Sequence, residues 1–411
     1  MENQPLVHQD CILTWDGRLD NREELRSRLG KIYENIPTDV DLVLACYKEW
    51  GNKCFAELLG DWSLALWDGA QKRLILARDY IGVRRLFYRV DEEGISWCTT
   101  LEPLVLQSGR KLHLDFDYLA GYLCPPPPLE TTPYKEIRSV LPAFLEIFGH
   151  GGSHVTERYW ALKPDRIQYP SDADYERHFR EIFEASVARR LRADRTVLAE
   201  LSGGLDSSSI VCVADGILDD APGVALKTIS YYDTDEASGD ERPYFSLVEK
   251  RRGHVGHHIS KSDFAQETRR EALQPLPPGA FAAAPGYFAK SLRWASLIDG
   301  VQCKAGSRVT LSGLGGDEIL GGVQYEAPEL AGYLVDGEFV SFVRSLCSWA
   351  LARKKTVFQL TGDTIGLLRA GRNPESFVSS GHRRVPWVRF EQSHRHRLLS
   401  RFADWHSLSP T

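Results

Sequence analysis

The sequence predicts two consecutive domains, a β-rich α+β domain followed by an α/β domain built on a parallel sheet. Short strand-like runs dominate before residue 150, whereas strand and helix patterns alternate after it, which is typical of a parallel sheet with helical crossovers. A stiff run of prolines at 125–128 and a glycine-rich break at 149–153 separate the two patterns. We therefore expect the first domain to cover residues 1–148 and the second to cover residues 154–411.

In the first domain, the apolar runs at 63–68 and 73–78 predict strands, and residues 39–50 predict a helix. The second domain starts with a helical pattern at 174–191. The elements expected after it are a strand at 196–202, a helix at 207–218, a strand at 227–232 and a short apolar strand at 309–311. In sheets of this kind, ligands bind at the carboxyl ends of the strands.

A glycine- and hydroxyl-rich loop follows the buried strand at 196–202 and precedes a helix. Its two glycines let the backbone approach an anion closely, and the helix N-terminus adds N–H donors. Asp206 repels phosphate on its own, so we expect it to hold Mg²⁺ against phosphate groups. The alternative is an ordinary strand–turn–helix corner with a polar cap. The expected phosphate site comprises Ser202, Gly203, Gly204, Leu205, Asp206, Ser207 and Ser208.

A second loop of the same character, Ser312 to Glu318, follows the apolar run at 309–311. We expect the two loops to face each other across the sheet edge, with Asp206 and Asp317 bracketing one metal–pyrophosphate group. A plain glycine turn with a capping acid is the alternative for this loop alone. The binding residues expected here are Gly313, Gly315 and Gly316.

Composition excludes several classes of function. Acidic residues outnumber basic ones by 56 to 50, which gives no electrostatic support for a nucleic-acid or membrane-surface partner. No apolar run approaches the roughly 20 residues that a membrane-spanning helix needs, and the N-terminus does not read as a signal peptide. The eight cysteines form no CxxC pair, so we expect buried thiols in the cytoplasm rather than a zinc or disulfide framework.

The two loops, about 110 residues apart, resemble the synthetase domain of the asparagine synthetases, which are ATP pyrophosphatases. The first half resembles the glutamine amidotransferase domain of the same family. The resemblance covers roughly residues 10 to 330. The segments that carry it in the first half are 16–25, 60–68, 77–88, 132–137 and 158–160.

The resemblance implies an incomplete α+β Ntn-hydrolase-like amidotransferase domain, followed by an α/β ATP-pyrophosphatase domain with an adenine nucleotide alpha hydrolase-like parallel sheet. It also implies that ATP and Mg²⁺ are cofactors. A carboxylate would attack the α-phosphate of ATP, and an amine would then attack the acyl-adenylate to give an amide and AMP. Asp206 and Asp317 would be the catalytic metal ligands. Ser230 would lie near the adenine ring, with an ordinary turn role as its alternative.

Departures from the family pattern in the first half argue against glutamine hydrolysis. The amidotransferases of this family use an N-terminal cysteine as nucleophile, whereas residue 2 here is Glu2. Cys11 cannot replace it and is expected to be a strand thiol. The remnants of the glutamine site, Asn21 and Asp39, are then expected to be structural.

Departures in the second half change the expected substrate. Leu314 stands where the family has a glutamate that binds or deprotonates ammonium, and the loop is more similar to the lasso-peptide macrolactam cyclases. This favours a precursor peptide as the carboxylate substrate. The family also has a catalytic lysine beyond the second loop, whereas Lys354 and Lys355 are expected at a solvated helix end. Asparagine synthesis, and a non-catalytic subunit that binds a peptide or a complementing subunit, remain alternatives.

Overall fold

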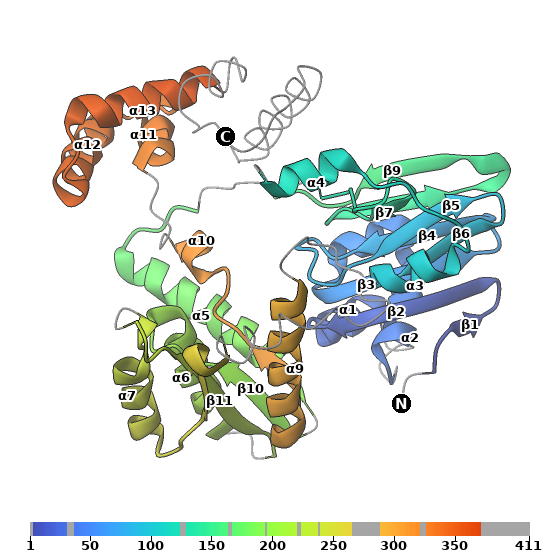
Figure 1. Cartoon of the computed structure of the whole chain (residues 1–411), viewed down its shortest axis with the longest axis horizontal. Helices are drawn as coiled ribbons and strands as arrows, with labels where there is room; N and C mark the ends of the chain where they lie inside the picture. The colour runs from blue at the N-terminus through green and yellow to red at the C-terminus, as the bar shows by residue number, and fades with distance from the viewer. Residues whose placement is uncertain are drawn as a thin grey trace. The chain divides into compact units, whose positions relative to one another are not determined.

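The computed structural model describes residues 3–30, 37–123, 129–162, 167–193, 195–219, 223–236, 239–264, 288–320 and 326–370. The chain divides into two compact units (Figure 1). The first unit comprises Met1–Asp115 and Leu129–Gly313, and the second comprises Phe116–Pro128 and Leu314–Thr411.

The first unit begins with a six-stranded antiparallel sheet in the order β1-β2-β3-β4-β8-β9. The predicted strands at 63–68 and 73–78 are confirmed as β3 and β4. Neighbouring strands run antiparallel throughout, so short connections suffice between them. The strands are β1 (Leu6–His8), β2 (Cys11–Leu19), β3 (Gly60–Asp68), β4 (Arg73–Arg78), β8 (Phe144–Phe148) and β9 (His154–Arg158).

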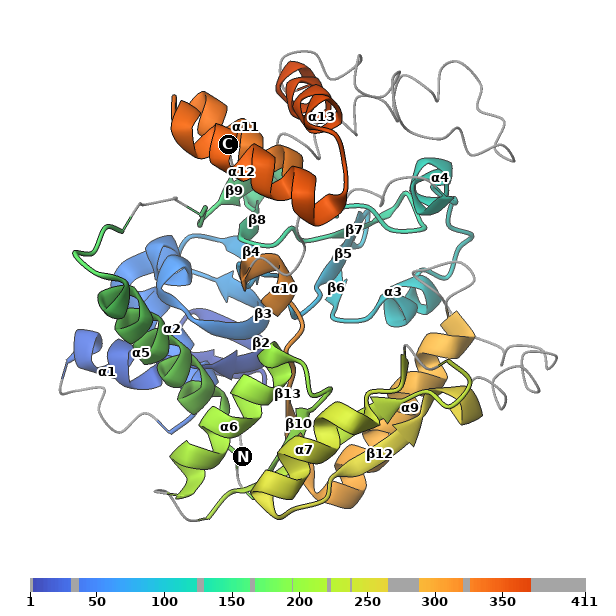
Figure 2. The same ribbon diagram turned by 90° about the vertical axis from the view of Figure 1, so that its left-hand side faces the viewer.

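Both faces of this sheet are covered, because β3 and β4 are apolar on both faces. Leu64 and Leu66 pack with Trp62 and Phe55 in the core on the side of α1 (Arg22–Leu29) and α2 (Asp39–Trp50) (Figure 2). Helix α2 matches the predicted range and is capped by Thr38, whose hydroxyl accepts a hydrogen bond from the Asp41 N–H. A 3₁₀ helix, η2 (Gly51–Glu57), follows it.

The opposite face packs against a small three-stranded antiparallel sheet in the order β6-β5-β7. Ala65, Leu74 and Leu76 of the large sheet meet Leu86 and Tyr88 there. The small sheet consists of β5 (Phe87–Asp91), β6 (Gly94–Cys98) and β7 (Ile137–Ser139), and α3 (Leu101–Gln107) and η3 (His150–Gly152) lie in the same part of the chain.

The second half of the first unit is a parallel four-stranded sheet in the order β12-β11-β10-β13. The predicted alternation of strands and helices is confirmed here. The strands are β10 (Thr196–Glu200), β11 (Ala225–Tyr232), β12 (His257–Ser260) and β13 (Ser307–Leu311). The helices are α5 (Asp172–Arg190), α6 (Leu205–Asp219), α7 (Arg242–Arg252) and α9 (Phe288–Ala305).

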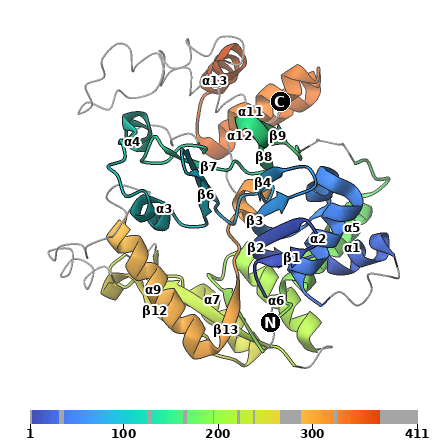
Figure 3. The same cartoon turned by 90° about the vertical axis from the view of Figure 1, so that its right-hand side faces the viewer.

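Side-chain alternation along β10 places helices on both faces of this sheet. Val197 and Ala199 join Val211 of α6 in one apolar cluster, whereas Leu198 packs with Leu297 and Val301 of α9 in another. Helix α9 therefore covers one face, and α5, α6 and α7 cover the other (Figure 3). A strand buried on both faces reads as a continuous apolar run, which is why its sequence was recognisable.

The second unit is helical in its described residues. It contains α4 (Phe116–Leu123), α10 (Gly316–Leu320), α11 (Glu326–Val335), α12 (Phe339–Arg353) and α13 (Val357–Ala370). Leu330 of α11 and Leu360 of α13 are fully buried. Among the residues that the structure describes, no helix is long and apolar enough to cross a membrane.

Candidate functional site

The first glycine loop lies at the carboxyl edge of the parallel sheet, between β10 and α6. Strand β10 has a neighbour on each side, and it ends at Glu200. Helix α6 begins at Leu205, earlier than the predicted start at residue 207, so Asp206, Ser207 and Ser208 lie in its first turn. The helix therefore presents its free N–H groups at the position where the sequence predicted a phosphate site.

The loop is held in shape by hydrogen bonds between its own hydroxyl and backbone groups. The Ser202 N–H donates to Ser207 Oγ at 3.2 Å, and the two serine hydroxyls lie 2.9 Å apart. The Gly204 N–H donates to Ser202 Oγ at 3.2 Å. These bonds connect residues 202, 204 and 207, and they define the shape of the turn between β10 and α6.

Gly203 allows this loop to pass close to the start of α7. Its φ is +84°, and a Cβ atom there would lie 2.4 Å from Tyr244 Cβ and 2.6 Å from the Phe245 nitrogen. No L-residue fits both the backbone conformation and the space. The glycine at this position is required by packing and by the backbone conformation.

Two serine hydroxyls near the loop have no hydrogen-bond partner within the described part of the chain. The Ser208 Oγ atom is buried in the first turn of α6. Ser230 on β11 is fully buried, so its side chain has no exposed surface to offer a base. Its approach to an adenine ring stays a prediction.

The second loop begins beside the first. Strand β13 pairs in parallel with β10, so their carboxyl ends meet at one edge. A Cβ atom on Gly313 would lie 3.1 Å from the Ser207 nitrogen and 3.4 Å from Asp206 Cβ, which puts Gly313 against the first turn of α6. The chain after Gly313 belongs to the second unit.

Gly315, Gly316 and Asp317 are therefore described within the second unit alone. Gly315 has a φ of +92°, Gly316 begins α10, and Asp317 is exposed. The pairing of Asp317 with Asp206 around one metal ion stays a prediction. No group of three or more His, Cys, Asp or Glu side chains forms a metal site within the described residues. The donors that Asp206 offers fit Mg²⁺ only if phosphate oxygens and water complete its shell.

Glu200 is a site residue that the sequence reasoning missed. Its carboxylate lies at the end of β10 and accepts hydrogen bonds from the Tyr231 hydroxyl at 3.1 Å and from the Ser312 hydroxyl. It thereby joins the ends of β10, β11 and β13. Burial raises the pKa of Tyr231, and the neighbouring charge of Glu200 adds to the effect. The sequence signal that could have identified Glu200 is an acidic residue at the last position of a buried strand.

Asn21 and Asp39, which we expected to be structural from the sequence, are both hydrogen-bonded within the first half of the chain or to Arg192. The side-chain nitrogen of Asn21 donates to the Glu57 carbonyl at 2.9 Å, and its side-chain oxygen accepts from the Leu59 N–H at 3.1 Å. Asp39 accepts from the Leu19 N–H at 2.8 Å and from the guanidinium of Arg192. Both side chains thus have structural partners.

Cys11 has the properties of a strand thiol. It begins β2 and is buried, and burial raises its pKa, with the nearby Asp68 carboxylate adding to the shift. A thiol that resists ionisation is a poor nucleophile.

The two late lysines lie around the end of α12. Lys354 takes a left-handed conformation immediately after the helix, and Lys355 forms an ion pair with Glu326 of α11. Both are exposed, and Lys355 connects helices of the second unit. Leu314, in the same unit, is 93% exposed.

A parallel sheet whose central strand leads through a glycine loop to a helix N-terminus is typical of α/β domains that bind phosphate groups. Comparison with known families makes the assignment specific. Residues 1–160 match the family model of the glutamine amidotransferase domain. Residues 178–405 match the family model of asparagine synthase. The chain belongs to the asparagine synthase family, with an N-terminal amidotransferase domain followed by the synthase domain.

Curated relatives support the same assignment. The chain is 28% identical to asparagine synthetase [glutamine-hydrolyzing] 3 of Bacillus subtilis, over 75% of this chain and 51% of that protein. It is 25% identical to putative asparagine synthetase [glutamine-hydrolyzing] 2 of Methanocaldococcus jannaschii, over 83% of this chain and 63% of that protein. It is also 29% identical to amidase chyE of Penicillium rubens, over 52% of this chain and 32% of that protein. The chain thus spans about half to two thirds of the first two relatives.

Proposed function

We propose that this chain binds ATP at the 202–208 loop and catalyses AMP-forming synthesis of an amide bond. The observation that carries the proposal is the glycine loop at the start of α6, on the carboxyl edge of the parallel sheet. Glycine is the residue type that fits the backbone conformation and the space at position 203. The Ser208 hydroxyl, which has no hydrogen-bond partner among the described residues, lies in the first turn of α6.

The chemistry asked of these residues is mainly charge stabilisation. An oxygen of the substrate carboxylate attacks the α-phosphorus of ATP, the bond to the β-phosphate oxygen breaks, and pyrophosphate leaves. The loop N–H groups and the hydroxyls of Ser202 and Ser208 would hold the negative charge of the leaving group. Asp206 and Asp317 would hold Mg²⁺ on the same group. An amine nitrogen then attacks the acyl carbon, loses a proton, and expels AMP.

We further propose that the carboxylate belongs to a peptide and that the attacking amine is the N-terminus of that peptide, as in the lasso-type cyclases. Leu314 supports this choice, because a leucine neither binds an ammonium ion nor removes its proton. An amine delivered by the peptide itself has a high effective concentration and does not depend on such a glutamate.

Asparagine synthesis from aspartate is a second candidate. It is favoured because the relatives from Bacillus subtilis and Methanocaldococcus jannaschii are both named asparagine synthetases. The two candidates differ in the substrate that stimulates ATP cleavage. Asparagine synthesis requires aspartate with ammonium, whereas cyclisation requires a peptide with a free N-terminus and an Asp or Glu side chain.

The test is the formation of labelled AMP from ATP labelled at the α-phosphate, with pyrophosphate followed by a separate coupled assay, for each substrate in turn. The Asp206→Asn variant should reduce release by at least about 100-fold. Asp219→Asn is the matched control, because Asp219 is exposed at the opposite end of the same helix and should leave the rate unchanged. Equal loss in both variants would contradict a role for Asp206.

A direct measurement of Mg-ATP binding separates a ligase from a non-catalytic subunit. The wild-type chain should bind Mg-ATP, and Asp206→Asn should bind it more weakly than Asp219→Asn does. A chain that binds no Mg-ATP, while both variants fold normally, would support the binding-subunit alternative.

A further inference from the structure

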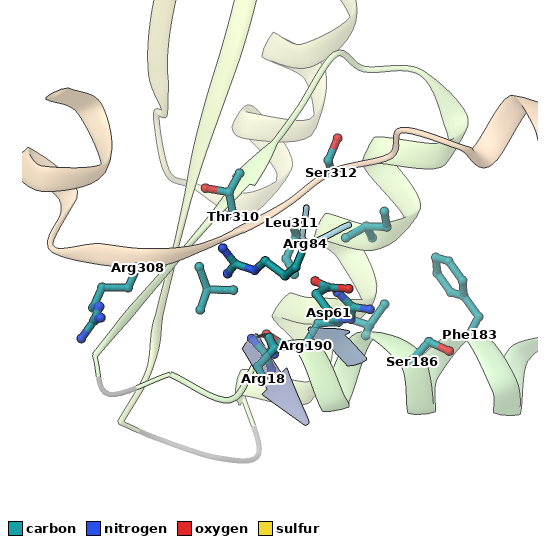
Figure 4. Close-up of a pocket in the computed structure, with 13 residues that line it drawn as sticks. Arg18, Asp61, Arg84, Phe183, Ser186, Arg190, Arg308, Thr310, Leu311 and Ser312 are labelled. Carbon is teal, nitrogen blue, oxygen red and sulfur yellow. Dashed lines mark hydrogen bonds and ion pairs between the residues drawn. The ribbon is translucent and has the colours of Figure 1, made fainter. Parts of the chain in front are cut away.

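A cavity of ≈ 340 Å³ runs along the edge of the parallel sheet at β13. Within the described residues, β13 pairs with β10 on one side and with no strand on the other. Every residue from Arg308 to Ser312 contributes to the cavity wall. In Figure 4 the β13 ribbon passes from Arg308 through Thr310 to Ser312, with Arg18, Asp61, Arg84 and Arg190 gathered on one side of it. We call this cavity the β13 slot.

The wall of the slot opposite β13 is mixed in character. Phe183 of α5 and Ile210 of α6 supply apolar surface, whereas Val187 is buried with Leu311 in the core cluster behind them. Arg18 and Arg190 supply charge, but both are already neutralised. Arg18 and Arg190 each pair with Asp20, and Arg190 also pairs with Asp61 at 2.5 Å. Apolar surface with a few charged groups is the usual lining of a site that binds an organic ligand.

Two other arginines leave positive charge in the slot. The Arg84 side chain is 47% exposed, and its ion pair with Asp16 is long, at 3.7 Å. Arg308 is exposed, and no ion pair joins it to any described residue. Guanidinium groups of this kind bind carboxylates with two parallel hydrogen bonds. The slot therefore favours a ligand that carries carboxylates.

The slot leads toward the ATP loop proposed above. Its wall ends at Ser312, whose hydroxyl donates to Glu200, and the next residue, Gly313, lies against Asp206 and Ser207. A chain lying along β13 would therefore pass from Arg308 toward the first turn of α6. This is the direction in which a reacting carboxylate would have to be delivered.

We propose that the β13 slot binds an acidic peptide segment in extended conformation, as an added strand on β13. The peptide backbone would pair with the outer edge of β13, and the Val309 N–H and carbonyl would exchange the Ser307 hydroxyl for peptide groups. The apolar side chains of the peptide would contact Phe183 and Ile210, and its carboxylates would pair with Arg84 and Arg308. This inference rests on the proposed function, because the bound segment would belong to the peptide substrate.

The test uses a fluorescein-labelled pentapeptide, acetyl-Val-Glu-Val-Glu-Val-amide, with binding followed by fluorescence anisotropy in the absence of ATP. A control peptide with Lys in place of both Glu residues (the Lys twin) tests whether binding depends on negative charge. A second control peptide with alternate N-methylated amides (the N-methylated twin) tests whether binding depends on backbone hydrogen bonds. The Glu peptide should bind, and each twin should bind at least about tenfold more weakly.

Variants locate the binding. Arg84→Glu and Arg308→Glu should each weaken the Glu peptide by about fivefold or more. Arg251→Glu on α7 is the matched control, because Arg251 is exposed and lies outside the slot, and it should have no effect. Bound peptide should also slow hydrogen exchange in the fragment that spans residues 307–313.

The proposal is overturned if the Glu peptide does not bind, if the Lys or N-methylated twin binds equally well, or if exchange at residues 307–313 does not change. Circular dichroism and thermal unfolding of the same variants should match the wild type, which shows that they are folded. Because the peptide is measured without ATP, a failure here is distinct from a failure of AMP formation, which is assayed with Asp206→Asn.

Discussion

At Gly203, the packing of the fold and the proposed phosphate site both require a residue without a side chain. Its positive φ and the 2.4 Å approach of Tyr244 Cβ to the position of a Cβ atom exclude any side chain. Gly204, the next residue, has only the flexible Ser202 hydroxyl near it, at 3.2 Å. Two adjacent glycines in one loop thus carry different constraints.

We predict that Gly203→Ala lowers the free energy of unfolding by about 2–4 kcal/mol, because it combines backbone strain with a steric clash. Gly204→Ala should cost less than about 1 kcal/mol. Urea denaturation of both variants measures the difference. Equal losses would show that the close packing of Gly203 on α7 does not hold in solution.

Glu200 acts on the strand ends rather than on one loop. Its carboxylate accepts from Tyr231 of β11 and from Ser312 after β13, so one side chain joins three strands where both loops begin. Tyr231 is held by this bond on the face that also packs against Trp294.

We predict that Glu200→Ala lowers the free energy of unfolding by about 1–3 kcal/mol, because it leaves the Tyr231 hydroxyl half-buried without its acceptor. Glu200→Gln keeps an acceptor oxygen and should recover most of the loss. Thermal and urea unfolding of the pair check this. If Gln is as damaging as Ala, the charge of Glu200 rather than its hydrogen bonds is what the fold needs.

At the scale of elements, the C-terminal end of α5 is joined to the first sheet by ion pairs. Arg190 pairs with Asp20 and Asp61, and Arg192, just after the helix, pairs with Asp39. Cations at a helix C-terminus also interact favourably with its dipole. These contacts fix the approach to β10, and the loop proposed to bind ATP follows directly from that strand.

Asp39 gives this junction a defined pH dependence. Burial by itself raises the pKa of Asp39, but the hydrogen bonds from Arg192 and the Leu19 N–H, with the charges of Arg192 and Arg22, outweigh it and hold the pKa below its ordinary value of 3.8. A lowered folded-state pKa contributes stability above the unfolded-state value, and that contribution is lost as the pH falls through the folded-state value.

We predict that Asp39→Asn costs about 1–3 kcal/mol of unfolding free energy at pH 7, and that the difference from wild type shrinks as the pH falls below about 4. Glu23→Gln is the control, because the Glu23 side chain is 84% exposed in its pair with Arg26 and should cost less than about 0.5 kcal/mol. Urea titrations at several pH values give the curve. A difference that does not change with pH would mean that the charge of Asp39 contributes nothing.

At the scale of the whole molecule, six of the described cysteines fall into a buried group and an exposed group. Cys11, Cys46 and Cys54 are buried in the core of the first sheet, and burial raises the pKa of Cys46 to about 12. The exposed cysteines lie on helices elsewhere, namely Cys212, Cys303 and Cys347.

We predict that iodoacetamide at pH 8 labels Cys212, Cys303 and Cys347 in the native protein, and that it labels Cys11, Cys46 and Cys54 only after unfolding. Peptide mass spectrometry identifies each site. Labelling of Cys46 at the rate of Cys212 in native protein would show that the first core is open to solvent.

The sequence alone determined the order of the two domains, the elements around the loop, and the family. Each of these depends on local signals. Helix α2 has a capping residue and an apolar face, β3, β4 and β10 are continuous apolar runs, and the 202–208 loop has a motif of high specificity. The start of α6 differed from the prediction, because the serines and Asp206 that suggest a loop also suit a first helical turn.

Tertiary structure alone decided which side chains meet. The sequence does not show that Glu200 holds Tyr231 and Ser312, that Arg192 takes the carboxylate of Asp39, or that Gly313 lies against Ser207. The partners in each case are distant in the chain, and only the order of the strands brings them together. The reason is physical: local patterns fix which groups face the core, whereas strand pairing and helix packing choose their neighbours.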